Sequence, residues 1–123
     1  MKYLFHVSNI LLIIFYLYPG SIVGCFIYND CKIQPQLTKD FLVSSNHTYV
    51  FFIISLLGFI AYSEKTVFKK IITYIFFISV ILELAHVVVP ERSFQIEDLA
   101  GNIVGVVISL IVFLIFKFRK KNE

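Results

Sequence analysis

Runs of apolar residues alternate with short polar segments along the chain, and this pattern predicts four membrane-spanning helices. The first run covers about residues 3–18 and ends at a Pro-Gly pair, which discourages a helix from continuing. Three further runs cover about residues 48–62, 71–89 and 99–116. We therefore expect an all-α, polytopic membrane protein, built as a four-transmembrane-helix bundle in a single domain over residues 1–123.

The polar segments between these runs are predicted to be connections. Residues 20–46 form the longest one and contain Pro35, so we expect a loop there. Residues 63–70 form a short basic turn, which makes the second and third helices antiparallel neighbours. Pro90 is predicted to end the third helix, and Ser93 is predicted to be the N-cap of the fourth.

Composition excludes an ordinary soluble domain, because 59% of the residues are hydrophobic and only 15% are charged. The net charge of +3 does not indicate a nucleic-acid partner. The basic residues flank the apolar runs instead of forming a patch interleaved with aromatic side chains. The lipid bilayer is therefore the expected partner.

Basic residues also predict the orientation, since cytoplasmic segments next to membrane spans collect Lys and Arg. Eight of the eleven lie at the N-terminus, in the turn 63–70 and in the C-terminal tail, against three in the other connections. We expect a multi-pass protein of the plasma (inner) membrane with both termini inside (N-in/C-in). Residues 20–46 and the segment around Pro90 then face outward, whereas His6 lies too far inside to join an outer site.

Two features of the N-terminal third have alternative interpretations. The first run resembles a short signal peptide, and residues 22–25 loosely resemble a lipoprotein cleavage box. The single Lys2 before the run and the further apolar runs after it favour a retained helix. Cys25 and Cys31 pair if the loop faces an oxidising compartment and otherwise remain separate thiols, so their state stays open.

A set of polar residues is predicted to gather where the third and fourth helices open to the outer surface. Glu83 and His86 share one helix face, and Asp98 and Asn102 share another. A charge inside a span costs roughly 2.5–3.5 kcal/mol, so the carboxylate of Glu83 should face protein or water. The guanidinium of Arg92 could bridge these carboxylates or hold an external anion. We take these five residues as the candidate ligand-binding cluster, with mutual pairing of their side chains as the purely structural alternative.

More specific chemistry receives less support from the sequence. The Glu-x-x-His pattern supplies metal ligands in helical bundles, but the chain carries one copy where such centres use two, so we expect no metal and no cofactor. His47, at the outer start of the second helix, could contribute to the cluster. Neither Ser45 nor Ser93 lies in a nucleophile elbow or an oxyanion loop, so no catalytic residue is designated.

Small residues repeat at four-residue spacing on the last helix, namely Gly101, Gly105 and Ser109. Such a face is typical of close helix packing in membranes.

Residues 83–105, ELAHVVVPERSFQIEDLAGNIVG, resemble the signature of the VanZ-like membrane protein family. The resemblance is one of spacing between an acidic residue, an arginine, an aspartate, an asparagine, a glycine and another small residue. The positions that match are Glu83, Arg92, Asp98, Asn102, Gly105 and Ser109. The first helix ending in Tyr-Pro-Gly and the position of His47 are similar as well.

The chain departs from that pattern at three places. The family often has glutamine where His86 stands and an acidic residue where Gln95 stands. It also has an Asp-Lys pair shortly before the histidine, where this chain has Val43 and Ser44, and this weakens the role implied for His47.

The resemblance implies four spans, a cell-envelope setting and a link to low-level teicoplanin resistance. We therefore hypothesise that the cluster recognises or modifies a lipid-linked or cell-wall component, with Arg92 on an anionic group and Glu83 and Asp98 positioning it. The alternative is a structural module whose small face docks another membrane protein. A transporter is disfavoured, because the spans are short, unbroken and without inverted repeats.

Overall fold

The computed structural model describes residues 1–123 and contains only α-helices and connections, which confirms the predicted all-α fold. The helices are α1 (Lys2–Leu17), α2 (Ile22–Tyr28), α3 (Ser45–Ala61), α4 (Lys65–Ala85) and α5 (Ile96–Asn122). The long helices α1, α3, α4 and α5 correspond to the apolar runs of the sequence.

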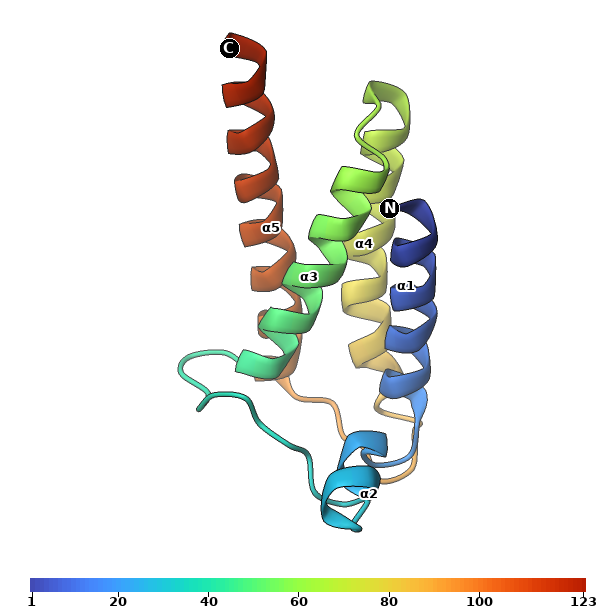
Figure 1. Ribbon diagram of the computed structural model, residues 1–123. Helices are drawn as coiled ribbons and strands as arrows, with labels where there is room; N and C mark the ends of the chain where they lie inside the picture. The colour runs from blue at the N-terminus through green and yellow to red at the C-terminus, as the bar shows by residue number, and fades with distance from the viewer.

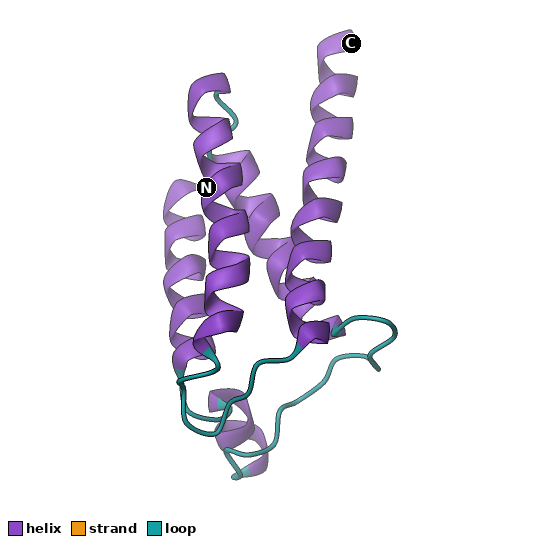
Figure 2. Ribbon diagram, turned by 180° about the vertical axis from the view of Figure 1, so that it is seen from behind, coloured by secondary structure: helices purple, strands orange, loops and turns teal.

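The four long helices pack side by side and alternate in direction along the chain (Figure 1). Both termini and the turn between α3 and α4 lie at one end of the molecule, which we call the terminal end. The opposite end, which we call the loop end, carries α2, the segment that follows it and the connection from α4 to α5 (Figure 2). Residues that end α1 and α4 therefore meet residues that begin α3 and α5.

The prediction that residues 20–46 form only a loop is wrong, because α2 lies within them. Gly20 has φ of 90°, a left-handed conformation that favours glycine and turns the chain after α1. The N–H of Gly24 then donates to the side chain of Ser21 at 3.0 Å, which satisfies one of the free donors at the start of α2. A short helix can thus begin directly after the Pro-Gly pair.

Cys25 and Cys31 form a disulfide. The sequence had left open whether these residues are paired or are separate thiols. The bond connects α2 to the segment just after it. The N–H of Ser21 also donates to the carbonyl of Cys31 at 2.8 Å. These links hold α2 against the turn that follows α1.

α4 and α5 differ from their predicted ranges. α4 begins at Lys65 instead of 71, because the lysines of the basic turn continue the helix, and it ends at Ala85 instead of 89. The prediction of Ser93 as N-cap is wrong, since Gln95 occupies that position. The backbone N–H of Gln95 donates to Glu83 Oε1 at 3.2 Å, which fixes where α5 starts.

The core between the long helices is apolar and combines aromatic with aliphatic side chains. Phe5 from α1, Phe51 and Phe59 from α3, Ile75 from α4 and Val106 from α5 are almost completely buried. Burial of each such side chain contributes roughly 1.5–3 kcal/mol in water. These side chains fix the spacing of the helices that carry the polar residues.

α3 and α5 make the most extensive contact in the molecule, and glycines allow it. A Cβ atom at Gly101 would lie 2.6 Å from the carbonyl oxygen of Ser44, and one at Gly105 would lie 2.4 Å from that of Thr48. Ser109, the third small residue, is fully buried. The small face of α5 therefore lies against α3.

α5 is the one helix that is long and apolar enough by itself to cross a membrane. α1 and α2 meet the same criterion only as a pair, and they are bent by 81° relative to each other. α3 is apolar but shorter. Many large apolar side chains are exposed on the outer faces of the long helices, including Ile10, Ile14, Ile53, Ile60, Phe77, Ile81, Ile111 and Ile115.

Candidate functional site

Three ionisable side chains from three different helices meet at the loop end. His47 lies in the first turn of α3, Glu83 in the last turn of α4 and Asp98 in the first turn of α5. Nδ1 of His47 lies 3.9 Å from Glu83 Oε2, and Nε2 of His47 lies 3.6 Å from Asp98 Oδ2. We call these three residues the carboxylate–histidine cluster.

Glu83 is the most deeply placed member, with a side chain that is 0% exposed. Its Oε1 accepts from the backbone N–H of Gln95 and lies within hydrogen-bond distance, 3.2 Å, of His86 Nδ1. Its Oε2 is buried and has no hydrogen-bond partner. One carboxylate oxygen is therefore satisfied, and the other faces the cluster unpaired.

Asn102 lies next to His47 of the cluster and is also completely buried. Its Nδ2 donates to the carbonyl oxygen of Ser79 at 2.9 Å, which fixes the orientation of the amide. Its Oδ1 accepts from the hydroxyl of Tyr16 at 2.7 Å and lies 3.0 Å from Nδ1 of His47. The Tyr16 oxygen and His47 Nδ1 are 2.6 Å apart. These contacts join α1, α3, α4 and α5 in one polar network.

His86 connects the same network to the end of α1. Its Nε2 donates to the carbonyl oxygen of Tyr16 at 3.0 Å, and its ring stacks on the Tyr16 ring with centroids 5.1 Å apart. The carbonyl is free because α1 ends at Leu17, and the last carbonyls of a helix have no partner within it. The Glu-x-x-His pair thus faces inward, toward α1 as well as α5.

The start of α3 is held by groups outside the helix, and these position His47. Asp40 Oδ1 accepts from the backbone N–H of Ser45 at 2.9 Å. This hydrogen bond is the main cause that lowers the pKa of Asp40 below 3.8. The N–H of Ser44 donates to the carbonyl of Glu97 at 3.1 Å, which ties the start of α3 to the start of α5.

Arg92 does not bridge the carboxylates, which was one of the two roles left open for it by the sequence. No Lys or Arg forms a salt bridge with Glu83 or Asp98. Nη1 of Arg92 donates instead to Gln34 Oε1 at 3.5 Å, and its Nε is buried without a partner. The turn through Glu91, whose φ is 61°, carries Arg92 toward the segment after α2.

A polar cavity of about 430 Å³ opens at the loop end beside the cluster. Asp98, His86 and Arg92 border it, and Glu83 lies behind His86 and Gln95. The full lining consists of Pro19, Gly20, Ser21, Cys31, Lys32, Gln34, His86, Glu91, Arg92, Ser93, Gln95 and Asp98. The cavity therefore contains donors, acceptors and both signs of charge.

The structure brings together Glu83, His86, Asp98 and Asn102 of the predicted set. Sequence reasoning missed Tyr16, whose ring and hydroxyl lie at the centre of the network, and it gave His47 only a minor part. A signal for Tyr16 exists in α1, where the buried residues Phe5, Asn9, Leu12 and Tyr16 follow a spacing of three and four. That spacing predicts the face of α1 that packs against the other helices, and the Tyr16 hydroxyl lies at the end of this face.

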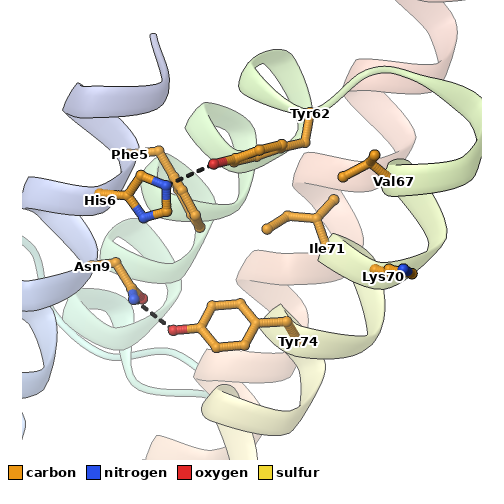
Figure 3. A pocket seen from close by; sticks show the side chains of 8 residues that line it. All are labelled: Phe5, His6, Asn9, Tyr62, Val67, Lys70, Ile71 and Tyr74. Carbon is orange, nitrogen blue, oxygen red and sulfur yellow. Dashed lines mark hydrogen bonds between the residues drawn. The ribbon is translucent and has the colours of Figure 1, made fainter.

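A second polar group lies at the terminal end, away from the cluster (Figure 3). His6 Nε2 lies 2.6 Å from the hydroxyl of Tyr62, and Asn9 Nδ2 donates to the hydroxyl of Tyr74. These residues border a cavity of about 310 Å³ together with Phe5, Val67, Lys70 and Ile71. His6 thus lies at the opposite end from the candidate site.

The fold and the site define a class: small all-helical proteins with a buried cluster of ionisable side chains at one end of an apolar bundle. The chain belongs to the VanZ/LLP1 family, whose model matches residues 3–117. This result confirms the resemblance found in residues 83–105, and the match includes every residue of the cluster. No curated protein and no solved structure matches the chain.

Proposed function

We propose that the chain is a four-span protein of the plasma membrane with both termini in the cytoplasm. The alternating direction of α1, α3, α4 and α5 supports this, as do the apolar side chains on their outer faces. Most basic residues lie at the terminal end, as expected for a cytoplasmic side. The disulfide at the loop end suits an oxidising exterior.

We further propose that the loop-end cavity binds the anionic head group of a lipid-linked or cell-wall component. The observation that carries this proposal is Arg92, which borders the cavity with its Nε buried and unpartnered. A guanidinium presents several donors in a planar fork that matches phosphate or carboxylate oxygens. Lys32 borders the same cavity and adds a second positive charge.

In this proposal the remaining polar residues position the head group. Asp98 and His86 border the cavity, and Glu83 holds both His86 and the backbone of Gln95 in place. The carboxylate of Asp98 can accept hydrogen bonds from hydroxyl or amide groups of a glycan or peptide next to the anion. The proposed function is recognition, and a link to teicoplanin susceptibility follows if the bound component is the antibiotic's target or its precursor.

The test replaces Arg92 with glutamine, which removes the charge while keeping a polar side chain of similar length. Arg119→Gln, in the exposed tail at the terminal end, is the matched control. Lipids retained by each purified protein are measured by mass spectrometry, and teicoplanin susceptibility is measured at equal membrane abundance. We expect Arg92→Gln to lose a retained anionic lipid or glycan that the control keeps. Equal retention and equal susceptibility in both variants would refute head-group binding.

Docking of a partner through the small face of α5 receives no support, because α3 already covers that face. Gly101 and Gly105 approach the backbone of α3 too closely for another helix to enter.

A further inference from the structure

We propose that His47, Glu83 and Asp98 form a binding site for a divalent transition-metal cation. One ligand atom from each residue lies within 4.8 Å of the other two. The distance of 3.6 Å between His47 Nε2 and Asp98 Oδ2 is close to the value for two ligands of one ion. Tetrahedral coordination with bonds near 2.1 Å separates its ligands by about 3.4 Å.

The unpaired oxygen of Glu83 is an independent indication of a cation. Oε2 is buried and has no hydrogen-bond partner, while Oε1 of the same carboxylate is satisfied by Gln95 and His86. Burial of an unpaired carboxylate oxygen is costly unless it coordinates a metal or pairs with a charge. No Lys or Arg pairs with Oε2, and its salt-bridge contact, Nδ1 of His47 at 3.9 Å, lies beyond hydrogen-bond distance.

The hydrogen bonds around His47 prepare one of its nitrogens for coordination. Asn102 Oδ1 can only accept, and the Tyr16 hydroxyl already donates its hydrogen to that oxygen. His47 Nδ1 faces both of these oxygens and therefore carries a hydrogen. The lone pair is then on Nε2, which faces Asp98. Metal-binding histidines characteristically donate their other N–H to a fixed acceptor in this way.

The donor set indicates which cations the site would prefer. One imidazole and two carboxylates suit Zn²⁺, Mn²⁺ or Fe²⁺, whereas Mg²⁺ favours oxygen ligands and retained waters. Three protein ligands leave a coordination position for a water or another molecule. Asp98, one of the three ligands, borders the same polar cavity as Arg92. The cation site goes beyond head-group recognition and does not depend on it.

The experiment uses the full chain in detergent or nanodiscs, without a polyhistidine tag, stripped with EDTA and labelled with ¹⁵N-histidine. Zn²⁺ alone is the probe. We expect one saturable equivalent by calorimetry and a change in the ring ¹⁵N shifts of His47. His6, at the opposite end of the molecule, provides the internal control and should not shift. This measurement needs no variant, so a folding defect cannot obscure it.

Variants then identify the ligands. Glu83→Gln and Asp98→Asn should each weaken Zn²⁺ binding by about tenfold or more. Loss of a residue that only hydrogen-bonds to a metal ligand already weakens metal binding by about tenfold, and loss of a ligand should cost at least as much. Glu97→Gln removes an exposed carboxylate from the same turn of α5 and should bind like the wild type. Arg92→Gln should also keep Zn²⁺ binding, so loss of head-group binding alone remains distinguishable. Absence of saturable binding, an unshifted His47 ring, or unchanged affinity in Glu83→Gln would each overturn the proposal.

Discussion

Substitution of Gly105 by alanine tests the contact on which the whole loop end depends. The added Cβ would lie 2.4 Å from the carbonyl oxygen of Thr48 and 2.9 Å from the backbone nitrogen of Phe52. Ordinary contact begins at 3.4 Å, so the first of these atoms must retreat by 1.0 Å, the difference between the two distances. Both neighbours are backbone atoms and cannot turn away as a side chain would. α3 and α5 must therefore separate.

Two opposing effects set the size of this change. Alanine is favoured over glycine in the middle of a helix by roughly 0.5–1 kcal/mol, which alone would stabilise the protein. Inserting a methyl group into a well-packed contact costs about 1–3 kcal/mol. Because the obstacle is backbone, we take the upper part of that range and expect a net loss of about 1–2 kcal/mol.

The assay is reversible unfolding in mixed micelles with increasing SDS, followed by far-ultraviolet circular dichroism. Gly58→Ala is the matched control, because the nearest atoms to its added Cβ belong to the side chains of Ile75 and Phe5. We expect this control to be less destabilised, since the ends of side chains can adjust. If Gly105→Ala is as stable as the wild type, the α3–α5 contact is looser than described here.

Two further predictions concern the groups around the cluster. Asn102→Ala leaves the buried Tyr16 hydroxyl without its acceptor and should cost about 1–3 kcal/mol in the same unfolding assay, whereas a neutral result would contradict the network. The pKa of Asp40 is lower in the folded protein than its ordinary value of 3.8. Its hydrogen bond to the start of α3 therefore stabilises the fold fully above pH 3.8, and this stabilisation is lost as the pH falls through the lowered pKa. Protection of the Ser45 amide against exchange, taken relative to the intrinsic exchange rate at each pH, should therefore fall in strong acid, and Asp40→Asn should remove this change in protection.

The apolar runs predicted the long helices well, because a long run of mostly hydrophobic residues in a chain of this composition has few possible structures other than a helix. They predicted the ends less well, since tertiary hydrogen bonds decide where each helix starts. α5 begins after Gln95 because that backbone N–H is bound by Glu83, a residue on another helix. α2 was missed because it is short and follows a Pro-Gly pair that usually ends regular structure.

Within the site, residues that share a helix face could be predicted and those from other helices could not. The spacing of Glu83 with His86 and of Asp98 with Asn102 places each pair together without knowledge of the fold. Tyr16 was missed because a tyrosine at the end of an apolar run is ordinarily an interfacial residue. Which of the two roles Arg92 takes could not be predicted, because the direction of a side chain on a connection depends on its turn, which sequence spacing does not determine.

The hydrogen bond from His86 to the carbonyl oxygen of Tyr16 has a consequence for genetics. Every residue type at position 16 carries that carbonyl, so no substitution there removes the acceptor. Alanine scanning would register the loss of the ring and the hydroxyl while this contact with α4 persisted. The importance of α1 to the site will therefore be underestimated by side-chain mutagenesis, and displacing the helix end, for example by an insertion before Pro19, would reveal it.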